Sequence, residues 1–200
     1  MSDLTFHDSD GATMSEPIQN EDVVQATLTE AWALFSNDFV LYLIAGLLLL
    51  VGSIVSLGLL SGPLLVGFIE LVEKRRRGEE GSATDISSGF SKFGASLIAS
   101  LLIGIGVFIG SLLFVLPGLL FGLAMAFTFN AIASDDESAT GAMAKSFSII
   151  KENLALSAVF LVIVLVLSGI GGAVVFGTLL TMPFSLVLMT LVYARLAPTS

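Results

Sequence analysis

The chain has no cysteine and a single histidine, His7. Disulfides, thiolate metal sites and cysteine nucleophiles are therefore excluded. His7 lies in an acidic N-terminal segment with Asp3, Asp8 and Asp10, which we interpret as a solvated tail and not as a metal site. A Ser-His-Asp arrangement has no other histidine to use. The sequence thus predicts no metal, no cofactor and no enzymatic activity, and lipid-modifying catalysis is the least favoured function.

Charged residues are also scarce, at 12% of 200 residues, against about 25% in an average soluble protein. All 17 acidic and 8 basic side chains lie outside three uncharged runs, 39–69, 93–134 and 153–194. The second and third runs have 42 residues each, and a membrane crossing needs only about 20. The first run has 31 residues, so it is long for one span and short for two.

Glycines and prolines mark the expected turns or kinks within these runs. They are Gly62, Pro63, Pro117, Gly118 and Pro183. The predicted fold class is all-α: a polytopic membrane helix bundle of about six transmembrane helices in three hairpins, each preceded by a short amphipathic surface helix. All Lys and Arg residues would then share one side with both termini, and the positive-inside rule makes that side cytoplasmic. A five-span alternative remains open, because the N-terminal tail that it would move has no Lys or Arg.

An internal repeat supports three hairpins. Its aromatic anchors, Trp32, Phe90 and Phe147, are 58 and 57 residues apart. Apolar residues stand four positions before and three after each anchor, a spacing that puts all three on one helical face. The earlier ones are Leu28, Ile86 and Met143, and the later ones are Phe35, Phe93 and Ile150. The anchors and the later residues are predicted to hold a surface helix to the membrane. Polar residues six positions after the anchors, Asp38, Ser96 and Asn153, are expected to cap the next helix.

These patterns divide the chain into a tail and one membrane domain. Residues 1–21 are predicted to be an acidic disordered tail, which lacks the basic and apolar regions of a signal peptide. Residues 22–196 form a single domain of parallel repeats, followed by a short tail, 197–200. The repeats cover about 22–80, 81–137 and 138–196.

Five segments of the domain resemble a known family. They are GPLLVGFIELVE at 62–73, TDISSGFSKFG at 84–94, LPGLLFGLAMAF at 116–127, AMAKSFSIIKEN at 142–153, and the closing proline-to-tyrosine segment at 183–193. In this order they are similar to a small six-span prokaryotic family that includes DUF975 proteins, YciC-like proteins and the membrane domain found beside glycerophosphoryl diester phosphodiesterases. The resemblance implies a six-span fold in a prokaryotic plasma (inner) membrane. These 200 residues include no phosphodiesterase domain, so we do not expect that activity.

A few polar residues are candidates for a site. Four adjacent cations, Lys74, Arg75, Arg76 and Arg77, are able to contact anionic lipid, although a topology signal is the favoured interpretation. Glu70 is the one ionisable group within a span, and we expect it to reach the cytoplasmic headgroups. Asn130 is expected to hydrogen-bond a neighbouring helix, with a place in a cavity as the alternative. The net acidic cytoplasmic face argues against nucleic-acid binding.

Two classes of function remain. The first is a non-enzymatic membrane module that packs against membrane lipid, a membrane-protein partner or a second copy, and supports envelope organisation or assembly. Small residues four apart, such as Gly106 and Gly110, favour it because they let helices approach closely in lipid. The second is a small-solute transporter or channel that uses a path between the repeats.

Overall fold

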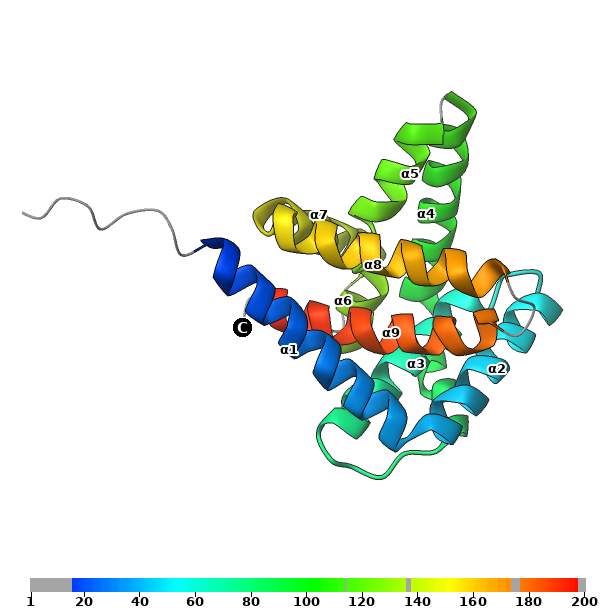
Figure 1. The fold of residues 1–200 in the computed structure, drawn as a ribbon. Helices are drawn as coiled ribbons and strands as arrows, with labels where there is room; N and C mark the ends of the chain where they lie inside the picture. The colour runs from blue at the N-terminus through cyan, green and yellow to red at the C-terminus, as the bar shows by residue number, and fades with distance from the viewer. Residues whose placement is uncertain (1–15, 114, 136–137, 174–176, 198–200) are drawn as a thin grey trace, which may run out of the picture.

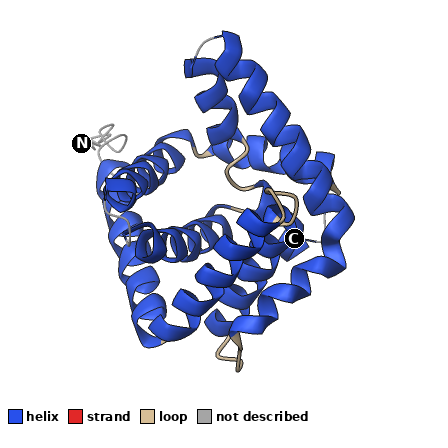
Figure 2. Cartoon of the chain, turned by 90° about the vertical axis from the view of Figure 1, so that its right-hand side faces the viewer, coloured by secondary structure: helices blue, strands red, loops and turns tan. Residues whose placement is uncertain are grey.

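The computed structural model describes residues 16–113, 115–135, 138–173 and 177–197. These residues form helices and no strands (Figures 1 and 2). The elements are α1 (Glu16–Asn37), α2 (Phe39–Val55), α3 (Ser61–Arg76), the 3-10 helix η1 (Ala83–Lys92), α4 (Phe93–Leu113), α5 (Val115–Ala124), α6 (Thr128–Asp135), α7 (Ala139–Glu152), α8 (Leu154–Ala173) and α9 (Gly177–Leu196). Since α1 begins at Glu16, residues 16–21 are helical and do not belong to a disordered tail; residues 1–15 and 198–200 lie outside the described part.

Four helical stretches are long and apolar enough to cross a membrane: Ala83–Leu113, Pro117–Asp135, Leu154–Gly172 and Gly177–Leu196. A fifth candidate is the pair Glu21–Asn37 and Phe39–Val55, which is bent by 89° at its junction. The prediction of an all-helical protein with several membrane-type helices is therefore confirmed. Two helices lie outside these stretches, α3 and α7. Of these, α3 has 16 residues, or about 24 Å at the usual rise, so a sixth span stays a prediction.

Burial separates the helices into an inner and an outer set. The inner helices are α3, α6 and α9, and α3 packs against both others. In the most apolar window, half of the residues are buried on α9 but only 11% on the α4 stretch and 22% on α8. The outer helices expose large apolar side chains such as Leu112 (78%) and Leu154 (66%). Soluble monomers rarely expose apolar patches of this extent, so the outer surface is of the kind that faces lipid.

The predicted surface helices pack against the inner set. η1 lies against α3, α7 lies against α6, and α1 lies against α9. The last contact joins the first and the last helix that the structure describes, and Figure 1 shows α1 beside α9. Edge-to-face contacts of Trp32 and Phe35 with Phe184 help to close it, with ring centroids 6.0 and 5.6 Å apart.

The residues predicted as turns mostly lie just inside helices. The chain reverses between α2 and α3 at Leu57 and Gly58, both with positive φ (52° and 85°). Gly62 and Pro63 follow in the first turn of α3, where proline is tolerated because its missing N–H would have no helical partner. Pro117 and Gly118 occupy the same place in α5. Pro183 lies in the interior of α9, so the chain does not turn there, and a kink at this proline stays a prediction.

The predicted helix caps are wrong. Asp38 directly precedes α2, but its side chain makes no capping bond. Ser96 lies inside α4 and donates to the carbonyl of Lys92 (2.9 Å). Asn153 ends α7, and its amide donates to the carbonyl of Ile149 (3.1 Å).

Candidate functional site

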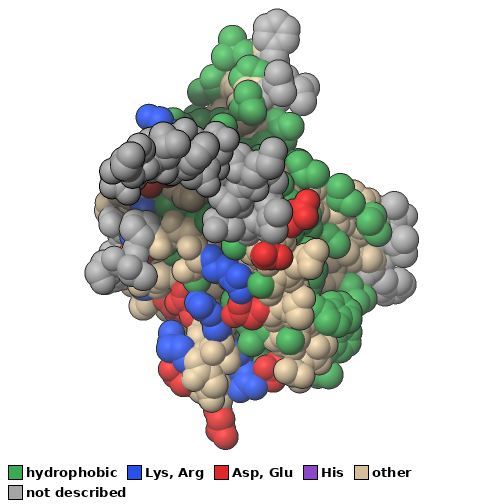
Figure 3. Space-filling view, turned by 60° about the vertical axis from the view of Figure 1, so that its left-hand side comes forward, with side chains coloured by type: hydrophobic (Ala, Val, Ile, Leu, Met, Phe, Trp, Pro, Cys, Tyr) green, Lys and Arg blue, Asp and Glu red, His purple; other side chains and the backbone are tan. Residues whose placement is uncertain are grey.

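Acidic and basic side chains are interspersed over one face of the molecule (Figure 3). They come from the C-terminal ends of the inner helices and from the surface helices and loops beside them. The four cations of the segment 74–77 each have a carboxylate partner. The pairs are Lys74 with Asp85 (2.8 Å), Arg75 with Asp38 (2.7 Å), Arg76 with Glu30 (3.5 Å) and Arg77 with Glu79 (2.6 Å). Their charge is thus compensated within the protein, and contact with anionic lipid stays a prediction.

The Arg75–Asp38 pair has the strongest geometry of these. The guanidinium donates twice to the carboxylate, from Nε (2.9 Å) and from Nη2 (2.7 Å). A third bond runs from Nη1 to the carbonyl of Glu79 (2.9 Å). Bidentate pairs of this kind are the stronger charge-assisted hydrogen bonds. Arg75 therefore ties the end of α3 to the junction of α1 and α2, which is the work that Asp38 does in place of capping.

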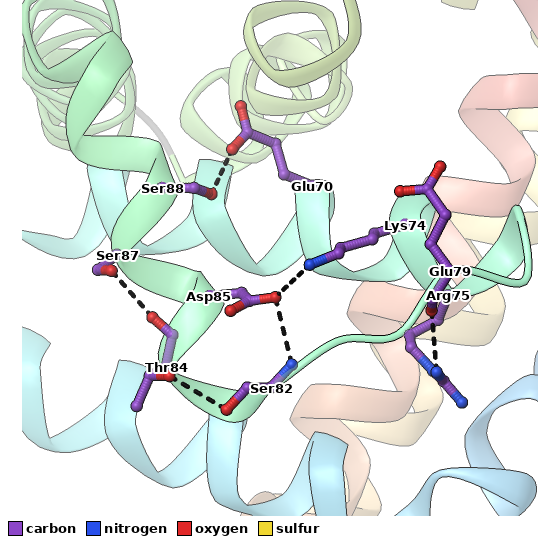
Figure 4. A network of polar contacts seen from close by, with 9 residues as sticks. All are labelled: Glu70, Lys74, Arg75, Glu79, Ser82, Thr84, Asp85, Ser87 and Ser88. Carbon is purple, nitrogen blue, oxygen red and sulfur yellow. Dashed lines mark hydrogen bonds and ion pairs between the residues drawn. The ribbon is translucent and has the colours of Figure 1, made fainter.

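Figure 4 shows the contacts between α3 and η1. Lys74 and the backbone N–H of Ser82 both donate to Asp85 (2.8 and 3.2 Å), which fixes the start of η1. In the loop after α3, the Arg77 guanidinium donates to Glu79 and holds the pKa of that carboxyl below its usual value. The same pair raises the pKa of Arg77.

These residues border a polar cleft of about 640 Å³. Its walls come from α3, η1 and the end of α6: Glu70, Glu73, Lys74, Arg77, Thr84, Asp85, Ser87, Ser88, Ala133 and Ser134, with Leu71 below them. Ser88 donates to Glu70, and Ser134 donates to Glu73. Among the described residues, no cluster of His, Asp or Glu is arranged to hold a metal ion. The cleft is thus a polar surface of paired charges between three helices.

Glu70 lies on this cleft and is paired. Its carboxylate is 3.2 Å from the ammonium of Lys92, which also donates to the carbonyl of Ala133 on α6. The side chain of Glu70 is 23% exposed. Glu70 therefore faces the polar cleft, and its contact with the cytoplasmic headgroups stays a prediction.

Asn130 is buried on α6 at 3% exposure. Its Oδ1 atom has no hydrogen-bond partner among the described residues, so the expected interhelical bond is not made through this atom. Sequence reasoning missed a third member of the set. Glu70, Asn130 and Thr190 are each 60 residues apart and occupy the three inner helices. Thr190 is 1% exposed, and its hydroxyl donates to the carbonyl of Leu186 (2.8 Å). The equal spacing was the available signal.

Ion pairs between surface and inner helices were also missed. Glu30 and Lys145 both stand two residues before their anchors. Glu30 pairs with Arg195 at 2.6 Å, and Lys145 pairs with Asp135 at 3.0 Å. Arg195 and Asp135 are again 60 residues apart. The two pairs therefore occupy corresponding positions with the signs exchanged.

The surface-helix anchors fall into two groups. Trp32, Phe90 and Phe147 are exposed at 61%, 40% and 53%, as residues that enter lipid would be. Phe93 is exposed at 39%, but Phe35 and Ile150 are buried at 2% and 9%. Those two are core residues and not surface anchors, because the helical face that carries them turns toward α9 and the neighbouring inner helices.

A small residue precedes each anchor and lets the surface helix approach an inner one. These residues are Ala31, Gly89 and Ser146. A Cβ at Gly89 would lie 3.0 Å from the Cα of Gly67, and closer to other backbone atoms of α3. Ser146 reaches the break between α5 and α6, where its hydroxyl accepts from the N–H of Phe127 (3.1 Å) and donates to the carbonyl of Ala124 (2.9 Å).

Comparison with protein-family models, curated proteins and solved structures finds no match for this chain. The function is therefore inferred from its own residues and their geometry.

Proposed function

We propose that this chain is a six-span integral protein of a prokaryotic plasma membrane, with both termini cytoplasmic, that acts as a non-enzymatic module for organising or assembling the envelope. Its motifs resemble the small six-span family described above, which is the reason for the prokaryotic inner membrane. The exposed apolar side chains of the outer helices support a place in lipid. In this arrangement α1, η1 and α7 lie on the cytoplasmic surface, and the 89° bend between α1 and α2 is the turn from surface to span.

Three parallel repeats are part of this proposal. Each repeat comprises a surface helix, an outer span and an inner return helix, and each surface helix packs on the return helix of another repeat. The corresponding pairs Glu30–Arg195 and Lys145–Asp135 support the repeat, and so does the 60-residue spacing of positions on α3, α6 and α9. Repeats of the same orientation are related by an axis along the membrane normal.

The observation that favours a scaffold over a channel is the burial of apolar side chains on the inner helices. Val72, Ile132 and Val192 are 60 residues apart on the inner helices, and each is 0% exposed. All three belong to one continuous hydrophobic core. A channel would need an aqueous path between the inner helices, and at these three positions the side chains are buried β-branched groups that pack in the core.

One observation favours the alternative of a small-solute transporter or channel. The buried Oδ1 of Asn130 has no partner among the described residues, and a buried polar atom without a bond is costly and often functional. Glu70 lies on the same set of inner helices and opens to the polar cleft.

A flux assay in proteoliposomes separates the two functions. If the protein is a scaffold, ions and small solutes should enter vesicles that contain the protein no faster than they enter protein-free vesicles. Saturable uptake that is lost in Asn130→Ala or Glu70→Gln would overturn the scaffold. Cross-linking in native membranes supplies the positive test, because an assembly module should give a reproducible adduct with a membrane protein or a second copy.

A further inference from the structure

Within the part of the chain that the structure describes, one apolar groove lies beside an unpaired cation. This groove is between α5, α7 and α8. It has a volume of about 420 Å³, within the range of ligand pockets. Leu154, Ala158, Leu161, Val162 and Leu165 line it from one face of α8. Leu120 and Leu123 of α5 form the opposite wall, and Phe147, Ile150 and Lys151 of α7 close the end at the membrane surface.

The groove exists because one packing interface of the bundle is open. The outer helix α4 packs on the inner helix α3, and α2 packs on α9. The corresponding pair would be α8 on α5, and these two helices make little contact. Instead, α8 packs on its hairpin partner α9, and α5 packs on its hairpin partner α4. Figures 1 and 2 both show the α4–α5 hairpin projecting away from the rest of the bundle. The corresponding surface is covered by a helix at the α4–α3 and α2–α9 interfaces. Between α5 and α8 it is open, and in the proposed function it would face lipid.

Lys151 is the cation of this groove. The chain has eight Lys and Arg residues, all of them described, and seven are paired with a carboxylate. Lys151 is the exception, because it forms no ion pair with a carboxylate that the structure describes. Its neighbour Glu152 accepts from the hydroxyl of Ser148 instead (2.7 Å). A lysine stem packs along apolar surface while its ammonium stays at the polar boundary, so Lys151 is placed to meet a headgroup.

The length of the groove fits one leaflet. From Leu154 to Leu165 the axial rise of α8 is about 16 Å, and half of a hydrocarbon core is about 15 Å. We propose that this groove is a binding site for one anionic phospholipid of the cytoplasmic leaflet, with an acyl chain between α5 and α8 and the phosphate on Lys151. The assignment rests on the proposed membrane embedding and orientation, and it names the lipid that the module holds.

Native mass spectrometry of the full chain, released from nanodiscs of equal phosphatidylglycerol and phosphatidylethanolamine, tests the site. One interfacial cation should enrich the first retained lipid in phosphatidylglycerol about fivefold. Lys151→Gln should abolish that preference while a lipid is still retained. The control Lys145→Gln makes the same change in net charge on the same helix, where Asp135 pairs with the ammonium, and should keep the preference. Ala158→Trp should fill the groove and lose the retained lipid, whereas Val159→Trp, on the adjacent exposed face of α8, should keep it.

Several results would overturn the site. They are a preference that survives Lys151→Gln, a preference that disappears in Lys145→Gln, equal loss of lipid in both tryptophan variants, or a dimer of the chain that Ala158→Trp dissociates. Helix content by circular dichroism and a single peak in size exclusion establish that each variant is folded. Solute flux would contradict the proposed scaffold without changing lipid retention, so the two failures are distinguishable.

Discussion

Replacing Gly67 by alanine places a methyl group against the backbone of η1. The new Cβ would lie 2.5 Å from the carbonyl carbon of Ile86, 2.8 Å from its Cα, and closer still to its carbonyl oxygen. Ordinary contact begins at 3.4 Å, so α3 and η1 must separate by at least the difference, 0.9 Å. The obstructing atoms are backbone and cannot rotate away.

The magnitude follows from two opposing effects. Overpacking costs about 1–3 kcal/mol, and backbone against backbone belongs at the upper end. Alanine regains about 1 kcal/mol in helix propensity. We therefore expect Gly67→Ala to lower the free energy of unfolding by about 2 kcal/mol. Reversible unfolding by sodium dodecyl sulfate in mixed micelles, followed by circular dichroism, measures it.

Gly104→Ala is the matched control. Gly104 lies in the middle of α4, and a Cβ there meets nothing within 4 Å. This variant should be as stable as the wild type or more stable, by up to about 1 kcal/mol. If Gly67→Ala were as stable as Gly104→Ala, the close crossing of α3 and η1 would be refuted.

Three further predictions use the same preparation. Ser146→Ala should cost about 1–3 kcal/mol, because the buried N–H of Phe127 and carbonyl of Ala124 lose their partner, whereas the exposed Ser148→Ala should cost much less; equal losses would contradict the bridge. Arg75→Ala should destabilise by about 1–2 kcal/mol through its bidentate, mostly buried pair, and Arg77→Ala, whose side chain is 58% exposed, by about 0–1 kcal/mol; the reverse order would count against the pair with Asp38. Arg77→Gln should raise the pKa of Glu79 toward its ordinary value, since the hydrogen bond that favours the charged carboxylate is removed, and NMR titration that found no rise would show that the pair does not form.

The helical fold was predictable because uncharged runs of this length have few other solutions. Burial in lipid forces backbone groups to bond within each segment, so composition alone predicts helices. The surface helices were partly predictable from apolar spacing at 28, 32 and 35. That spacing does not distinguish the lipid side from the core side, which is why Trp32 is exposed and Phe35 is buried.

The site depended on partners that are distant in sequence. Asp38 has a typical capping residue type, but Arg75, 37 residues away, binds its carboxylate instead. The four cations at 74–77 were visible as a cluster, and their carboxylate partners were not. Gly62 and Pro63 indicate a turn at their own positions, whereas the positive φ values of Leu57 and Gly58 place the reversal earlier.

The groove at Lys151 could not be predicted, because it is the absence of a contact. The sequences of α5 and α8 are as apolar as those of the helices that do pack. Only the direction of the α4–α5 hairpin leaves the interface open (Figure 1), and no local pattern encodes that direction.

Cysteine accessibility tests the six-span arrangement most directly, since the natural chain has no cysteine and each introduced thiol is unique. Leu57 is 93% exposed in the turn between α2 and α3, and Glu80 is exposed in the loop after α3. In intact spheroplasts, a membrane-impermeant maleimide should label Leu57→Cys, and it should label Glu80→Cys only after the membrane is opened. Protection of Leu57→Cys in both states would favour a single crossing by the first run, and labelling of Glu80→Cys in intact cells would contradict the cytoplasmic placement of the polar network.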